Sequence, residues 1–140
     1  MEVTFGSQRG LGRSGTDSLT AAPLLISVEL TAGGPVVALA GELDVATASL
    51  AQAVCLDACE AHSRSSIVVD LTRLSFCDCA GLNMLLHVHK RALMGNGWLR
   101  LSGASARVRK VLAITGLAST LMCYSMPADA FADVGPSTPP

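Results

Sequence analysis

The segment Cys77-Asp78-Cys79 places two thiols on either side of a carboxylate, directly before a largely apolar stretch, Ala80–Met94. A thiol at the start of a helix can have a lowered pKa and react as a thiolate. A neighbouring carboxylate works against this, because its charge repels the thiolate. The chemistry open to Cys79 is therefore oxidation to a sulfenic acid or to a disulfide, for which Cys123 is a candidate partner.

Three further metal-ligating side chains, Cys55, Cys59 and His62, are spaced at i, i+4 and i+7 and fall on one face of a predicted helix. Cys77 would add a fourth candidate ligand for zinc. Structural zinc sites usually contain a tight Cys-x-x-Cys knuckle, and the sequence has none. We therefore expect no metal site, and we interpret the two helical thiols as core residues and the histidine as exposed.

Thiol catalysis is the other chemistry that these residue types suggest, with Cys79 as nucleophile and His87 or His89 as base. A nucleophile and its base need a hydrogen bond of about 3 Å. On one helix these residues would be separated by about 12–15 Å of axial rise. The two histidines also lie on different helix faces, and the sequence has no Gly-rich loop of the P-loop kind. We expect a protein that is not an enzyme and needs no cofactor.

The overall composition limits the function classes that remain. The chain has 140 residues, 50% of them hydrophobic and 15% charged, which predicts one folded domain with a sizeable core. Its 10 basic and 11 acidic residues nearly cancel, which argues against direct binding to nucleic acid. No apolar run approaches the roughly 18 residues of a membrane span, and the first twenty residues lack the apolar stretch of a secretory signal. We expect a cytoplasmic protein with reduced thiols and no membrane contact.

Two ends rich in Gly, Ser or Pro flank the part of the chain that we expect to fold. Residues 1–22 are predicted to be a flexible N-terminal tail and residues 134–140 a flexible C-terminal tail. The domain between them spans residues 23–133. It begins with two extended runs, Leu24–Leu30 and Val36–Ala40, which a Gly-Gly-Pro turn joins into a hairpin.

Helices and strands then alternate along the chain. The β-branched run in Ser66–Leu71 is typical of a strand buried on both faces, and the predicted loop Thr72–Cys77 leads to Asp78, an N-cap for the next helix. Short connections between alternating strands and helices force parallel, right-handed crossovers. The predicted fold class is therefore α/β, a single domain with a mixed sheet of about five strands and helices packed against it. The remaining predicted elements are helices at residues 46–62, Ala80–Met94, Ser105–Thr115 (ended by Gly116) and Pro127–Ala132, and strands at Trp98–Leu101 and Thr120–Tyr124.

Three segments of the folded part carry a family pattern. They are Gly41–Thr47, then Ile67–Leu71 with Leu74–Leu82, and finally Leu99–Gly103 with Arg107–Leu112 and Thr115–Leu117. In order and spacing they resemble the STAS domain (sulfate transporter and anti-sigma factor antagonist), in particular the free-standing bacterial anti-sigma factor antagonists. The resemblance extends over nearly all of the folded part and implies the STAS-like α/β fold.

The resemblance also implies a protein-binding function. Such antagonists bind an anti-sigma factor, usually a serine kinase of the histidine-kinase-like ATPase class, and so free a sigma factor. In the family's Asp-x-x-Gly-Leu motif the residue after the Asp is a Ser or Thr, whose phosphorylation ends the binding. Here that position holds a cysteine. The implied partner-binding and switch corner consists of Asp78, Cys79, Ala80, Gly81 and Leu82, with Asp44 and Thr47 beside it.

The missing hydroxyl leads to two hypotheses about regulation. In the first, the protein permanently resembles the unphosphorylated, binding-competent form, because a thiol is nearly isosteric with a hydroxyl and Ala80 offers no acceptor either. In the second, oxidation of Cys79 replaces phosphorylation as the off-switch. A different class of function is a signal-input or scaffold module, which would bind regulators other than an anti-sigma factor. The oligomeric state stays open.

Simpler structural roles stay open for the same residues. Asp78 can be an N-cap worth about 1 kcal/mol, Gly81 can be a point of close packing between helix and strand, and Asp44 can cap the helix that follows it. The basic cluster within Arg107–Lys110 is either a solvated helix face or a contact for an acidic patch on a partner.

Overall fold

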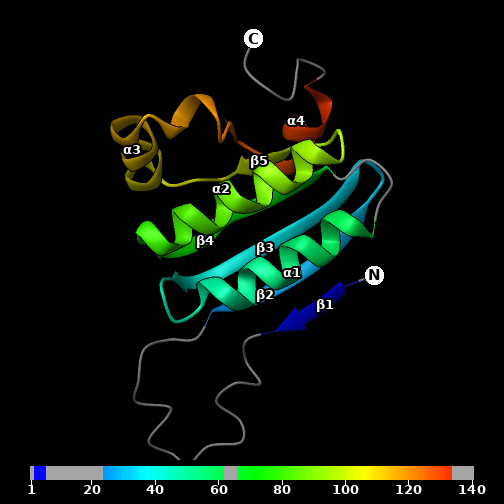
Figure 1. The fold of residues 1–140 in the computed structure, drawn as a ribbon, viewed down its shortest axis with the longest axis horizontal. Coiled ribbons are helices and arrows are strands. Elements are labelled where there is room, and N and C mark those ends of the chain that lie inside the picture. The colour runs from blue at the N-terminus through cyan, green and yellow to red at the C-terminus, as the bar shows by residue number, and fades with distance from the viewer. Residues whose placement is uncertain (1, 6–23, 62–65, 134–140) are drawn as a thin grey trace, which may run out of the picture.

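The computed structural model describes residues 2–5, 24–61 and 66–133, which form one sheet with helices against it (Figure 1). Among these residues no helix is both long and apolar enough to cross a bilayer. The strands are β1 (Glu2–Phe5), β2 (Leu25–Thr31), β3 (Gly34–Leu43), β4 (Ile67–Cys77), β5 (Leu99–Ser102) and β6 (Cys123–Tyr124), and the helices are α1 (Ala48–Glu60), α2 (Cys79–Met94), α3 (Ala106–Thr115), the 3-10 helix η3 (Leu117–Ser119) and α4 (Pro127–Ala132).

The sheet is mixed, as expected, and its strands follow the chain in the order β1-β2-β3-β4-β5-β6. The first three strands are antiparallel neighbours, and from β3 to β6 all neighbours are parallel. The predicted hairpin is β2 and β3, and the predicted alternation of helices and strands forms the parallel part. Parallel strands end at the same edge of a sheet, so the segments that follow β3 and β4 meet there.

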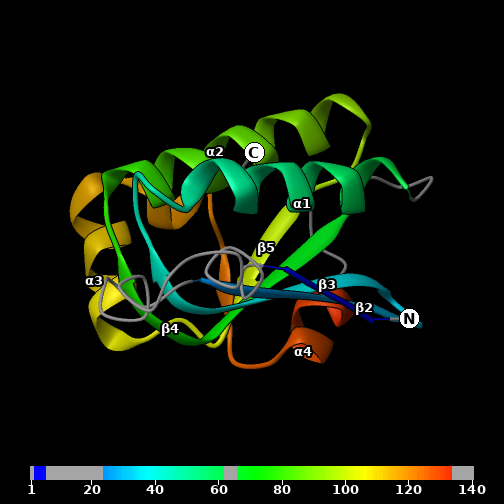
Figure 2. The same cartoon turned by 90° about the horizontal axis from the view of Figure 1, so that it is seen from below.

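The main core lies between the sheet and the pair α1 and α2, which cover one face side by side (Figures 1 and 2). In β4, Ile67, Val69 and Leu71 point into this core and are 0–1% exposed. Val68, on the other side of the strand, is also buried, which explains the continuous β-branched run. Helix α1 offers small side chains for close approach, and α2 offers larger ones at helical spacing. The buried residues of the two helices are Ala51, Val54, Cys55, Ala58 and Cys59 in α1, and Gly81, Leu82, Met84, Leu85, Val88, His89 and Ala92 in α2.

A smaller cluster covers the opposite face, where α4 packs (Figure 2). Arg100 is buried in this region, with its guanidinium 3.9 Å from the centre of the Trp98 ring. It donates hydrogen bonds of 2.7 Å to the carbonyl oxygens of Ala130 and Asp133. A buried cation is costly unless its donors are satisfied, so these contacts tie the C-terminal helix to the sheet. The apolar members of the cluster are Val36, Val68 and Ala130, with Trp98, Tyr124 and Phe131 packed against them.

The prediction of a flexible N-terminal tail is wrong for residues 2–5, because the structure places β1 there. This strand pairs antiparallel with β2, from Glu2 opposite Glu29 to Phe5 opposite Ile26. The physical reason is that β2 would otherwise be an edge strand with unpaired backbone donors and acceptors. Met1 and residues 6–22 and 134–140, which complete the two predicted tails, lie outside the described residues.

Two predicted boundaries also need correction. The predicted loop Thr72–Cys77 belongs to β4, because parallel pairing with β3 continues as far as Cys77, through two register shifts. The last strand is shorter than predicted, because a turn at Thr120 and a bend at Leu121 follow η3 and the strand begins only at Cys123. By contrast, α4 has the predicted bounds, and Gly116 ends α3 with a left-handed φ of 81°.

Candidate partner-binding site

The ends of β3 and β4 form the corner that positions the predicted site residues. Leu43 and Cys77 are in register as the last residues of these strands. The backbone N–H of Asp78 then donates to the carbonyl oxygen of Leu43 at 3.1 Å. The start of α2 is therefore fixed directly to the segment that begins with Asp44. In Figure 1 this corner lies at the end of the molecule that also carries α3.

Asp78 is the N-cap of α2, as predicted. Its backbone is extended, with φ −101° and ψ −170°, and its side chain accepts from the N–H of Gly81 at 3.1 Å. The cap satisfies one of the free N–H groups of the first turn, and such caps contribute about 1 kcal/mol. The carboxylate therefore has a structural role at the corner, whatever partner binds there.

Gly81 lets the first turn of α2 approach the strands closely. A methyl group at this position would lie 2.8 Å from the Sγ of Cys77, 2.8 Å from the Cγ of Leu43 and 2.9 Å from one Cδ of Leu43. Carbon atoms at rest are separated by about 3.5–4.0 Å, so any side chain here would push the helix away from the strands. The close packing that the sequence left open is thus present.

Exposure divides the remaining motif residues into those that face solvent and those that hold the corner. Cys79, the first residue of α2, is exposed, and Ala80 is half-buried. Leu82 is 5% exposed and belongs to the main core. The surface that a partner can touch is therefore Cys79 with the edges of Asp78 and Ala80, while Gly81 and Leu82 lie beneath it.

The turn after β3 is built by Asp44 and Thr47 together. The Asp44 carboxylate accepts from the N–H groups of Ala46 at 2.9 Å and Thr47 at 3.2 Å. The Thr47 hydroxyl donates to the Glu42 carbonyl at 2.9 Å and accepts from the Asp44 N–H at 3.0 Å. The N-cap of α1 is Thr47 and not Asp44, because the carboxylate serves the turn ahead of the helix. This turn holds Val45 at 79% exposure beside the corner.

The two thiols that flank Asp78 differ in accessibility. Burial, with smaller contributions from Asp78 and Cys79, raises the pKa of the Cys77 thiol to about 11. Its Sγ lies 3.7 Å from the Asp78 carbonyl oxygen, which accepts a weak hydrogen bond. Cys77 is therefore a protonated packing residue, and Cys79 is the exposed thiol of the pair.

Cys123 does not lie near Cys79, so the candidate disulfide is wrong. In the sheet register Cys123 is opposite Leu101, and Leu101 is opposite Val69. Val69 precedes Cys77 by eight residues on β4, and strands rise about 3.3 Å per residue, which gives a separation of about 26 Å along the strand.

The histidines and the α1 thiols have structural positions. His87 is exposed, whereas His89 is buried and its Nδ1 accepts from the backbone N–H of Leu99 at 3.2 Å. Cys55 and Cys59 are buried core thiols, as predicted, and burial raises the pKa of both. His62 lies outside the described residues. Within the part of the chain that the structure describes, no three His, Cys, Asp or Glu side chains are grouped as metal ligands.

A shallow groove beside the corner was not predicted from the sequence. It has a volume of about 80 Å³ and lies between the end of β4, the first turn of α2 and one side of α3. Phe76, which is 44% exposed, forms one wall. The only hint of the groove in the sequence was Phe76, an aromatic residue two positions before Asp78. Because Thr72–Cys77 was predicted to be a loop, the direction of this side chain could not be predicted. The groove is lined by Ser75, Phe76, Cys77, Leu82, Ser105, Arg107, Val108 and Val111.

The fold and this corner define a class of protein, a mixed α/β domain that presents the start of a helix at its surface. The STAS domain model matches residues 26–130 of the chain. The chain therefore belongs to the STAS domain family, and the resemblance noted in the sequence is confirmed.

Solved structures of similar proteins support the same assignment. An anti-sigma factor antagonist from Mycobacterium paratuberculosis is 27% identical, with a TM-score of 0.68 over 79% of this chain and 95% of that chain. The anti-sigma factor antagonist SpoIIAA in its unphosphorylated form is 26% identical, with a TM-score of 0.64 over 75% of this chain and 91% of that chain. The phosphorylated form of SpoIIAA, a Bacillus cell fate determinant, is also 26% identical, with a TM-score of 0.59 over 75% and 95% of the two chains.

Proposed function

We propose that this protein is an anti-sigma factor antagonist that binds a kinase-type anti-sigma factor in the cytoplasm and thereby frees a sigma factor. The observation that carries the proposal is its likeness, in sequence and fold, to the M. paratuberculosis antagonist and to SpoIIAA over most of each chain. The family membership supports it, because STAS domains include such antagonists.

The proposed contact surface is the corner Asp78–Leu82 with the turn of Asp44 and Thr47. Cys79 is the residue of the motif that faces solvent, and Val45 is exposed on the adjoining turn. The N-cap hydrogen bond and the close packing at Gly81 hold this surface in one geometry before any partner arrives. A preformed surface loses less conformational entropy on binding, which favours a stable complex.

In this proposal Cys79 stands in place of the phosphoacceptor and leaves the protein permanently competent to bind. A phosphate would add about −1.5 to −2 charges beside Asp78, and in an interface that charge would repel acidic groups and be costly to desolvate. The thiol adds none of this. The nearest hydroxyls do not replace it, because Ser75 donates to the Gly41 carbonyl at 2.9 Å and Thr47 donates to Glu42.

The test compares the wild type with Cys79→Ser in the presence of each purified kinase-type anti-sigma factor from the same cell. We expect the wild type to bind with equal affinity with and without Mg-ATP and to take up no phosphate. Cys79→Ser should bind, take up one phosphate and then be released. Cys79→Ser combined with Ser75→Ala is the matched control and should take up phosphate equally. The proposal fails if the wild type binds no anti-sigma factor, or if it is phosphorylated as fully as Cys79→Ser.

A redox switch is the second candidate, because Cys79 is an exposed thiol at a helix start. The Cys77 thiol is half-buried and packed against Leu43 and Gly81, and Cys123 is remote, so oxidation would have to give a sulfenic acid or a bond to another molecule. The measurement is the affinity for the anti-sigma factor before and after peroxide treatment, with Cys79→Ser as the insensitive control. Equal affinities of the oxidised and reduced wild type would rule this switch out.

A further inference from the structure

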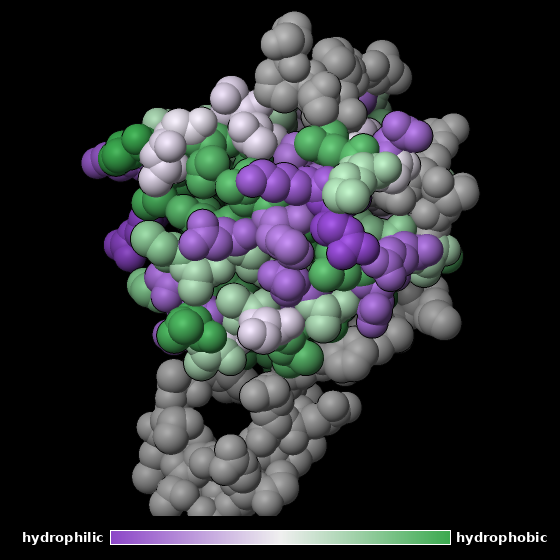
Figure 3. Space-filling model, in the orientation of Figure 1, coloured by the Kyte–Doolittle hydropathy of each residue, from purple (hydrophilic) through white to green (hydrophobic). Residues whose placement is uncertain are grey.

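The groove beside the corner continues into an exposed face of α3. Arg107, Lys110, Val111 and Ile114 are spaced at i, i+3, i+4 and i+7 and therefore lie on one side of the helix. Arg107 and Val111 also line the groove. Ile114 is 74% exposed although it is a large apolar residue. Figure 3 shows hydrophobic residues gathered toward this end of the molecule, and hydrophilic residues over the middle of α1 and α2.

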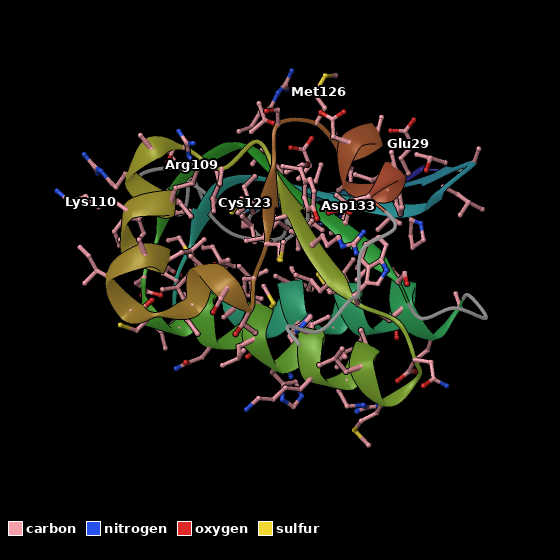
Figure 4. All side chains as sticks on the ribbon, turned by 90° about the horizontal axis from the view of Figure 1, so that it is seen from above. Glu29, Arg109, Lys110, Cys123, Met126 and Asp133 are labelled. Carbon is pink, nitrogen blue, oxygen red and sulfur yellow. The ribbon has the colours of Figure 1, made fainter. Side chains whose placement is uncertain are left out.

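Arg109 is on the same helix but on a different side. Figure 4 shows Arg109 and Lys110 projecting from α3 in different directions. Burial raises the pKa of the Cys123 thiol, and the nearby charge of Arg109 acts in the opposite direction, which places Arg109 toward β6. Arg109 is therefore an arginine of α3, like Arg107, that does not belong to the face at the groove.

The charged side chains on this face of α3, Arg107 and Lys110, are both positive. Residues 79–128 contain six Lys or Arg and no Asp or Glu, although the whole chain has a net charge of −1. Of these cations, Arg91 pairs with Glu60 at 2.9 Å, and Arg100 is buried against the C-terminal helix. Within residues 2–5, 24–61 and 66–133, Arg107 and Lys110 form no ion pair.

We propose that the groove and this face of α3 bind an acidic, amphipathic segment of the anti-sigma factor, as a second contact beside the Cys79 corner. This inference rests on the proposed function and names the chemistry of the partner's surface. An apolar side chain of the segment enters between Phe76 and Val111, and its carboxylates face Arg107 and Lys110. Cys77, which lines the groove, directly precedes Asp78 of the corner, so the two surfaces adjoin and one partner surface covers both.

Charge complementarity decides the occupant. A surface of exposed apolar groups with unpaired cations favours a partner segment that combines apolar and acidic side chains, and it disfavours a basic one, because like charges across an interface are costly. Charges at the rim of an interface act mainly on the association rate and are screened by salt. The association rate of the complex should therefore fall as the salt concentration rises, because salt screens the charges of Arg107 and Lys110.

The experiment uses the purified kinase-type anti-sigma factor that binds the wild type, with affinity and association rate measured at low and physiological salt. Arg107→Glu should weaken binding about tenfold at low salt, mostly through the association rate, and should flatten the salt dependence. Arg109→Glu makes the same charge change on the other side of α3 and should alter affinity by less than about twofold. Phe76→Ala should weaken binding about tenfold at both salt concentrations, as apolar anchors do. Circular dichroism should show that each variant retains its helices, since a Glu at the start of α3 is compatible with the helix dipole.

Cys79→Glu separates this inference from the proposed function, because it puts a negative charge on the corner alone. If Cys79→Glu abolishes binding while Arg107→Glu and Arg109→Glu bind alike, the second contact is refuted and the antagonist function stands. If the wild type binds no anti-sigma factor at all, both are refuted. A larger loss for Arg107→Glu than for Arg109→Glu, together with a loss for Phe76→Ala, supports the second contact.

Discussion

The close approach of α2 to the strand ends predicts that Gly81→Ala is destabilising, against the usual effect of this substitution in a helix. Replacing Gly by Ala inside a helix normally stabilises by up to about 1 kcal/mol. Here the new methyl group would lie within 3.0 Å of Leu43 and Cys77, and overpacking of this kind costs about 1–3 kcal/mol. Because the clash involves two groups in a packed corner, we expect a net loss of about 1–2 kcal/mol in the free energy of unfolding.

Urea denaturation followed by circular dichroism measures this loss. Asn83→Ala, at an exposed position of the same helix, is the matched control and should be neutral or stabilising by a few tenths of a kcal/mol. A double-mutant cycle with Leu43→Ala tests the cause, because removing the Leu43 Cγ relieves part of the clash. Leu43→Ala alone should cost about 2–5 kcal/mol, and the double variant should lose at least about 0.5 kcal/mol less than the sum of the single losses.

Two results would refute this reasoning. The first is a Gly81→Ala protein that is more stable than the wild type, since helix propensity would then outweigh the contacts. The second is an additive cycle, which would mean that Leu43 does not limit the approach of the helix. If the prediction holds, Gly81→Ala should also weaken binding to the anti-sigma factor, because the start of α2 must shift away from the strands.

Three further predictions concern single side chains. Burial lowers the pKa of His89 in the folded protein, so this histidine binds a proton more readily in the unfolded chain. The free energy of unfolding should therefore fall as the pH drops below about 6.5, the pKa of histidine in an unfolded chain. His89→Gln should remove this dependence and His87→Gln should not, and equal pH profiles for both would contradict it. Asp78→Ala should lose about 1 kcal/mol of stability and Asp78→Ser should keep most of it, as measured by thermal unfolding. Iodoacetamide at neutral pH should modify Cys79 in the native protein and spare Cys77, which mass spectrometry can check; modification of both at similar rates would show that Cys77 is accessible.

The elements that local chemistry specifies could be predicted from the sequence. The N-cap at Asp78, the C-terminal Gly116 of α3 and the Pro at the start of α4 each act within a few residues, and the structure has all three. The end of β4 could not be predicted in the same way. Its second half, Thr72–Cys77, has only one buried residue, Leu74, so the alternation of apolar and polar residues is lost. Its extended form depends on pairing with β3, which is distant in sequence.

The same difference between local and long-range interactions decides which parts of the candidate site could be predicted. The residues of the motif at Asp78–Leu82 were identified from the sequence, but the groove was not, because it joins β4, α2 and α3 through tertiary packing. Capping of α1 was one of the roles left open for Asp44, because an Asp close to a helix start is a normal cap signal. In the structure the Asp44 carboxylate instead accepts a hydrogen bond within the turn that precedes the helix. The Thr47 hydroxyl donates to the Glu42 carbonyl, and α1 begins at the residue after Thr47.

The absence of a hydroxyl at Cys79 has a thermodynamic consequence for the proposed function. A phosphorylated antagonist is removed from binding by a covalent step that consumes ATP. A protein without an acceptor at the corner is released only by dissociation, so the fraction of anti-sigma factor that it occupies depends on its concentration relative to the Kd. Control then moves to the amount of the protein and to competitors for the same surface. The exposed cations of α3 fit this situation, since they would set how fast the complex forms without changing the geometry of the corner.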